Sequence, residues 1–103
     1  MIKAVIPALL VATMAVGPAS ASYYNGNDMY AACRRDSQIF LMGYTMGVVD
    51  ALANYEACIP EEATVGQLVD VVCQYIKNNP SRRHVEGESL VFFSIRDAFP
   101  CKK

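Results

Sequence analysis

Asp97-Ala98-Phe99-Pro100-Cys101 ends the last amphipathic segment of the chain and places a cysteine just beyond a helix-stopping proline. The role of that cysteine depends on residues 1–21, which have the three parts of a secretory signal peptide. These parts are a basic start at Lys3, an apolar run over residues 4–17, and the small residues Pro18-Ala19-Ser20-Ala21. The apolar run is shorter than the about 20 residues of a membrane span. We therefore expect cleavage after Ala21 and export to an oxidising compartment, where cysteines pair.

Residues 22–103 are expected to form one small helical domain after removal of the signal peptide. Of the 103 residues, 82 remain, and a domain of this size buries only about 60–65% of its unfolded surface. Without Lys3, eight basic residues stand against ten acidic ones. No basic stripe is present, so nucleic acid is not an expected partner. No second apolar stretch is long enough to span a membrane. Together with the export signal, this predicts a location in the periplasm.

The four cysteines are Cys33, Cys58, Cys73 and Cys101. An even number in a short exported chain predicts two disulfides, with three possible connectivities. Cys58 and Cys101 follow the ends of helical segments, whereas Cys33 and Cys73 lie inside such segments. The preferred pairing is therefore Cys33 with Cys73 and Cys58 with Cys101. The long intervals between the cysteines do not resemble a Cys-x-x-Cys metal site, so no metal ion or cofactor is expected.

Two helical segments are predicted in the first half of the domain. The first follows the turn over residues 25–28, with Asn27 or Asp28 as its cap, and extends to about Arg35. The second is expected to begin at a Ser37 cap. Its apolar residues recur at helical spacing and predict one buried stripe, formed by Leu41, Tyr44, Val48 and Leu52.

Two more helical segments are predicted in the second half. The third begins with a Thr64–Gln67 capping box and is stopped by Pro80. Its expected buried residues are Leu68, Val69, Val72 and Ile76. The fourth is expected to begin near residues 81–84 and to end at Pro100, with a buried stripe of Val91, Phe92, Ile95 and Phe99. The predicted fold is thus an all-α bundle of about four helices, stapled by disulfides.

Small residues recur every fourth position on the second predicted helix, at Gly43, Gly47 and Ala51. Each glycine costs about 1 kcal/mol of helix propensity, so a structural reason for them is expected. Small residues at this spacing let another backbone approach closely. They are predicted to seat a neighbouring helix or a second protomer.

Catalytic chemistry is not indicated by the remaining polar residues. His84 could act as a general base or a pH sensor, but no nucleophile is placed beside it by the sequence. The adjacent Glu61 and Glu62 precede a helix, where carboxylates commonly complement the positive helix end. For both features we favour a non-catalytic role. We expect no catalytic residues and no enzyme activity.

The order of several short motifs resembles the Rap/Tai family of immunity proteins. The resemblance covers about Asn25 to Cys101. Its motifs are Gly43-Tyr44, Gly47-Val48-Val49-Asp50, Cys58-Ile59-Pro60, Thr64 with Gln67-Leu68, Asn79-Pro80 with Arg83-His84, and Ala98-Phe99-Pro100-Cys101. The resemblance implies a periplasmic, all-helical partner of a peptidoglycan amidase delivered by type VI secretion.

That resemblance also implies a mechanism, which is occlusion of the active-site groove of the amidase, and a homodimer. We expect the polar loop over residues 78–86 to make the contact, because binding residues concentrate in loops on a rigid scaffold. Its candidate contact residues are Asn79, Pro80, Ser81, Arg82, Arg83 and His84. The two arginines are expected to be exposed, so their replacement should leave the fold intact.

A second class of function stays open from the sequence, that of a small periplasmic acid-stress chaperone of the Hde type. Such proteins expose apolar surface on acidification, and His84 with ten carboxylates supplies groups that titrate. A chaperone would protect many client proteins at low pH. An immunity protein would bind one enzyme tightly at neutral pH.

Overall fold

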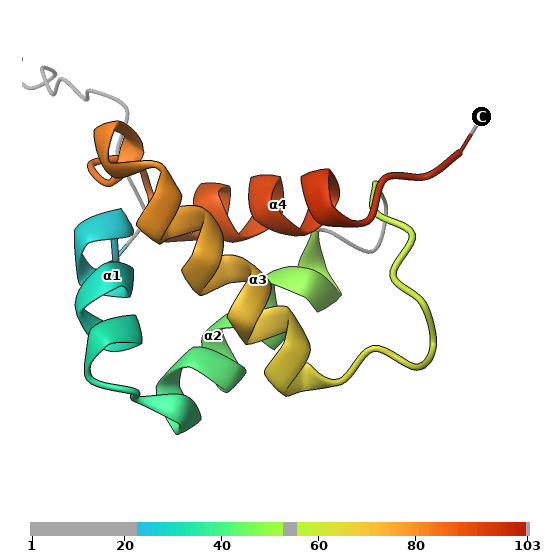
Figure 1. The fold of residues 1–103 in the computed structure, drawn as a ribbon, viewed down its shortest axis with the longest axis horizontal. Coiled ribbons are helices and arrows are strands. Elements are labelled where there is room, and N and C mark those ends of the chain that lie inside the picture. Colours follow the sequence, from blue (N-terminus) through green and yellow to red (C-terminus); the bar gives the residue numbers. More distant parts are fainter. Residues whose placement is uncertain (1–22, 53–55, 103) are drawn as a thin grey trace, which may run out of the picture.

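The structure, a computed structural model, describes residues 23–52 and 56–102. This part of the chain contains four α-helices. The helices are α1 (Gly26–Arg34), α2 (Gln38–Ala51), α3 (Val65–Asn78) and α4 (Gly87–Ala98), and a short 3-10 helix, η3 (Pro80–Arg82), precedes α4. Every pair of α-helices is in contact. Helix α1 stands at one end of the bundle, and α4 extends along one side toward the C-terminus (Figure 1). The all-α prediction is confirmed, while the expected signal peptide, residues 1–21, lies outside the described residues.

The N-terminus of α1 is closed by a reciprocal capping box. The side chain of Asn25 accepts a hydrogen bond from the Asp28 amide, and the side chain of Asp28 accepts one from the Asn25 amide, each at 3.0 Å. The cap residue is therefore Asn25 rather than Asn27 or Asp28, although Asp28 takes part as the second member of the box. The Thr64 cap of α3 was correct, since its hydroxyl accepts from the Gln67 amide at 3.0 Å. Ser37 precedes α2 without a side-chain capping bond.

The hydrophobic core receives side chains from all four helices. The four residues predicted to be buried on α3 are buried, and so are Val91 and Ile95 of α4. The predicted stripe on α2 was wrong at Leu52, which is 47% exposed because the helix ends at Ala51. The buried apolar residues are Met29, Ala32, Leu41, Val48, Val49, Ala57, Leu68, Val69, Val72, Ile76, Leu90, Val91 and Ile95.

Two disulfides connect segments that lie about forty residues apart in the chain. Cys33 pairs with Cys73 and joins α1 to α3, with the two Cα atoms 5.8 Å apart. Cys58 pairs with Cys101 and joins the loop after α2 to the C-terminal tail. Beside this second bond, the Cys58 amide donates to the Phe99 carbonyl at 2.8 Å. The structure thus has the pairing that the sequence favoured.

The start of α4 differs from the sequence prediction, which placed it near residues 81–84. The helix begins at Gly87, and the preceding residues pair with the N-terminus of α1 instead. The Gly26 amide donates to the Val85 carbonyl and the Gly87 amide donates to the Tyr24 carbonyl, both at 2.8 Å. These long-range bonds hold residues 83–87 in a turn. They also give partners to the first amides of α1 and α4, which have none within their own helices.

We predict that Gly26→Ala destabilises the protein by about 1–3 kcal/mol, because a methyl group has no room there. A Cβ atom at Gly26 would lie 2.7 Å from both the Cα and the carbonyl oxygen of Arg83. The matched control is Gly66→Ala in the first turn of α3, where the nearest atom is 3.9 Å away. The control should be neutral or stabilising by up to about 1 kcal/mol. Urea unfolding measures both free energies, and equal stability of the Gly26 variant and the wild type would contradict the close approach.

Candidate partner-binding surface

The predicted binding loop begins by closing the C-terminus of α3. The last carbonyl groups of a helix have no partner within the helix. The side-chain amide of Asn79 donates to the Tyr75 carbonyl at 2.8 Å, and Arg83 donates to the Ile76 and Lys77 carbonyls, each at 3.1 Å. The positive charge of Arg83 also suits the negative end of the helix dipole. Asn79 and Arg83 therefore stabilise the end of α3.

Arg83 also contacts α1. Its guanidinium carbon lies 3.6 Å from the ring centroid of Tyr30, a short cation–π distance. The Arg83 carbonyl accepts from the Asn27 amide at 2.8 Å. One residue thus connects the end of α3 to the start of α1. The sequence prediction that Arg82 and Arg83 are exposed was wrong, since both are half-buried.

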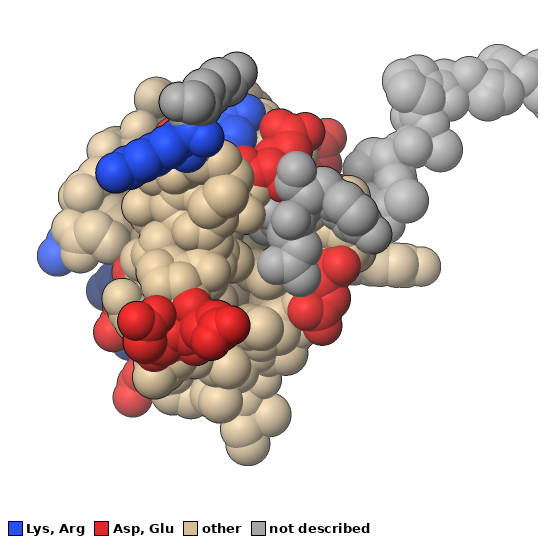
Figure 2. Space-filling view, turned by 90° about the vertical axis from the view of Figure 1, so that its right-hand side faces the viewer, with Lys and Arg blue, Asp and Glu red and all other residues tan. Residues whose placement is uncertain are grey.

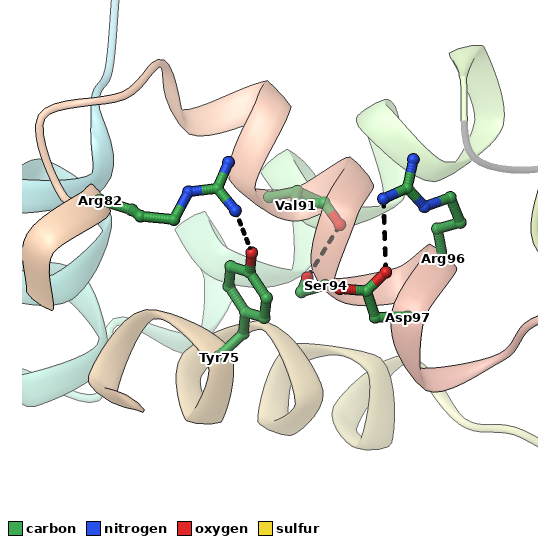
Figure 3. Close-up of polar contacts among 6 residues, drawn as sticks. All are labelled: Tyr75, Arg82, Val91, Ser94, Arg96 and Asp97. Carbon is green, nitrogen blue, oxygen red and sulfur yellow. Dashed lines mark hydrogen bonds and ion pairs between the residues drawn. The ribbon is translucent and has the colours of Figure 1, made fainter. Parts of the chain in front are cut away.

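Arg82 belongs to a row of aromatic and basic side chains along α3 and α4. It donates to the Tyr75 hydroxyl at 2.6 Å (Figure 3). Its guanidinium also lies over the ring of Phe93. Arg96 lies over the same ring. Tyr75, Phe93 and Arg96 were not among the residues predicted to form a site. The spacing of Phe93 and Arg96, three residues apart on one helix, was the available signal.

The solvent-facing part of the loop consists of Pro80, Ser81 and His84, all of which are exposed. Next to it, a groove of about 570 Å³ lies between α3 and α4, lined by Val71, Tyr75, Asn79, Ser94, Asp97 and Ala98 among others. The six predicted contact residues are therefore brought together, but in two layers. Asn79, Arg82 and Arg83 hold the loop, while the other three form its outer surface.

The small residues of α2 lie on a different face. Gly43, Gly47 and Ala51 are exposed, and a Cβ atom at either glycine would meet nothing within 4 Å in the described part of the chain. The described helices therefore do not pack against these glycines, and the alternative of a second protomer stays a prediction. On the same helix Ile39 is 91% exposed and Met42 is 40% exposed.

A half-buried aromatic cluster connects the N-terminal segment to α2. The rings of Tyr24, Phe40 and Tyr44 lie with their centroids 5.0 to 5.7 Å apart. The Tyr44 hydroxyl donates to the Glu88 carboxylate at 3.4 Å. Burial, followed by the nearby charge of Glu88, raises the pKa of Tyr44 to about 12. The phenol therefore stays protonated near neutral pH, and its hydrogen bond to Glu88 connects the cluster to α4.

Within residues 23–52 and 56–102, no cluster of three His, Cys, Asp or Glu side chains could hold a metal ion. None of the helices there is long and apolar enough to cross a membrane. Acidic side chains gather on the face shown in Figure 2, which is the end of the molecule opposite α1, and basic ones lie along one edge.

The family model of the Rap1a immunity proteins matches residues 25–101. The chain belongs to the Rap1a immunity protein family. The match includes all four helices, both disulfides and the whole loop between α3 and α4. An immunity protein acts by binding a cognate toxin, so the chain is not an enzyme. This membership decides against the acid-stress chaperone. No curated protein and no solved structure matches the chain significantly.

We predict that Arg83→Ala lowers the free energy of unfolding by about 1–3 kcal/mol, because it leaves helix-end carbonyls without a donor. The control is His84→Ala at the neighbouring exposed position, which should change stability by less than about 0.5 kcal/mol. Thermal and urea unfolding of both variants measure the difference. Equal stability of the two variants would show that Arg83 is dispensable for the fold.

We predict that the Tyr44 phenol titrates at about pH 12 rather than at 10.0. Because the folded state keeps the proton that the unfolded state releases, this group weakens the fold as pH rises from about 10 to 12. Alkaline titration followed by the ultraviolet absorbance of tyrosinate, with circular dichroism alongside, measures the pKa. Glu88→Gln should lower the pKa, and Tyr44→Phe should remove the late step. A curve that Tyr44→Phe leaves unchanged would contradict the assignment.

Proposed function

We propose that this Rap1a-family protein neutralises a peptidoglycan amidase delivered by type VI secretion, and that it does so in the periplasm by covering the active site of the amidase. The observation that carries the proposal is the family match over residues 25–101. The two disulfides support the location, since such bonds form in oxidising compartments. The signal peptide that would direct export, with cleavage after Ala21, is part of the proposal.

The loop after α3 is the surface best suited to enter a groove. Its base is held by hydrogen bonds from Asn79 and Arg83 and by the close contact between Arg83 and Tyr30. Its outer residues, Pro80, Ser81 and His84, are exposed. A loop that is ordered before binding loses little conformational entropy on association. We therefore place these outer residues in the active site of the amidase.

A second copy of the chain is the proposed occupant of the exposed face of α2. Asp50 is the one charged residue of this helix, and a helix that is apolar on most sides is normally buried. Ile39 and Met42 are exposed beside Gly43 and Gly47, which leave space for the close approach of another backbone. Packing of two α2 helices across this face would bury these residues and give a homodimer.

We predict that Ser81→Glu with His84→Glu abolishes protection while leaving the fold intact, because both residues are exposed. If the loop enters the active site, the loss of binding should reach about 2 kcal/mol or more. The assay is growth of cells that export the amidase together with either form of the protein. The control is Glu61→Lys with Glu62→Lys, two exposed residues in the loop between α2 and α3.

The control variant should protect fully. Full protection by the Ser81/His84 variant and loss of protection by the Glu61/Glu62 variant would move the contact to the loop over residues 56–63. Failure of the wild type to protect against any peptidoglycan amidase encoded near it would remove the proposed function.

We also predict that Ile39→Asp converts a dimer into a monomer at micromolar concentration, because it places a charge within the proposed apolar interface. Tyr23→Asp is the matched control, since Tyr23 is 93% exposed and lies outside α2. Sedimentation velocity measures the oligomeric state of both variants. A wild-type protein that is monomeric, or an Ile39 variant that stays dimeric, would remove the proposed interface.

A further inference from the structure

The outer face of α4 holds two guanidinium groups against one aromatic ring. The guanidinium carbons of Arg82 and Arg96 each lie 5.0 Å from the ring centroid of Phe93, so they are at most twice that distance apart. Arg82 reaches the ring from η3, and Arg96 reaches it from the next turn of α4. In Figure 3 the two side chains extend toward one another from opposite ends of the view. Contact with the Phe93 ring holds each guanidinium group in a defined direction.

The positive charges of this pair have little compensation among the described residues. The hydrogen bond of Arg82 goes to the Tyr75 hydroxyl and not to a carboxylate. Arg96 pairs with Asp97 through a single contact at 3.4 Å, and the two side chains are 42% and 56% exposed. Such an exposed pair is worth about 0–1 kcal/mol. Two cations with one weak carboxylate partner form a place where another anion is favoured.

The composition of this face is that of a binding surface. Arginine and aromatic residues are enriched among the residues that dominate the energetics of protein interfaces. A planar guanidinium can donate two parallel hydrogen bonds to a carboxylate. The groove between α3 and α4 is lined at its apolar part by Val71, Tyr75 and Ala98, and elsewhere by polar side chains that include Asp70 and Asp97. It offers room for an apolar side chain beside the anion.

We propose that Arg82, Phe93 and Arg96 form an anchoring site for a carboxylate-bearing segment of the toxin, with a neighbouring apolar residue of that segment in the α3–α4 groove. This inference rests on the proposed function, and it extends the contact surface from the loop onto α4. The loop enters the active site, and the arginine pair binds an acidic stretch at its rim. Arg96, Phe93 and Tyr75 thereby become residues that determine which toxin is recognised.

The test measures the affinity of purified protein for a peptidoglycan amidase against which it protects cells, by isothermal titration calorimetry at low and high salt. Arg82→Gln and Arg96→Gln should each weaken binding at least tenfold, on the order expected of an interface anchor. Arg96→Lys keeps the charge and should retain more affinity than Arg96→Gln. Arg35→Gln, an exposed arginine at the far end of α1, is the control and should bind like the wild type. Circular dichroism confirms that each variant is folded.

Charge reversal in the amidase identifies the partner carboxylate. An Asp or Glu of the amidase changed to Lys should restore binding of Arg96→Glu, and the wild-type pair should lose affinity as salt increases. Wild-type binding that neither glutamine variant weakens would overturn the inference and leave the proposed function standing. Lack of binding by the wild type would overturn both. Equal losses in Arg35→Gln and Arg96→Gln would show only a general charge effect and would also overturn the anchoring site.

Discussion

The disulfide between Cys33 and Cys73 is the constraint on which the position of α1 depends. Helix α1 has nine residues, and an isolated helix of that length is not stable in water. The disulfide fixes its C-terminal end to the middle of α3. Its N-terminal end is held by hydrogen bonds to the Arg83 and Val85 carbonyls. Because α1 is held at both ends, the loop that touches its start is held as well.

The loop between α3 and α4 therefore serves the fold and the proposed function with different residues. Its inner residue, Arg83, closes α3 and contacts Tyr30 of α1. Its outer residues, Ser81 and His84, are exposed and are not part of this packing. A binding loop with an anchored base costs less entropy to bind than a free one. The same anchoring places Arg82 beside α4, where it meets Phe93.

The sequence predicted the parts of the fold that depend on local pattern. The buried face of α3 and its Thr64 cap could be predicted because periodicity and capping act within a few residues. The start of α4 could not, because Gly87 is positioned by a bond to Tyr24, far away in the chain. The role of Arg83 depends on the same kind of long-range contact. The loop was selected as the candidate surface from its polarity, but Phe93 and Arg96 join it through the contact of the Arg82 side chain with the Phe93 ring.

Hydrogen–deuterium exchange of the protein alone and in complex with a cognate peptidoglycan amidase maps the contact surface on the intact protein. We expect amides of residues 79–86 and of the outer face of α4 to exchange more slowly in the complex. Amides of residues 56–63 should be unchanged. Protection confined to residues 56–63, with none in the α3–α4 loop, would contradict the account.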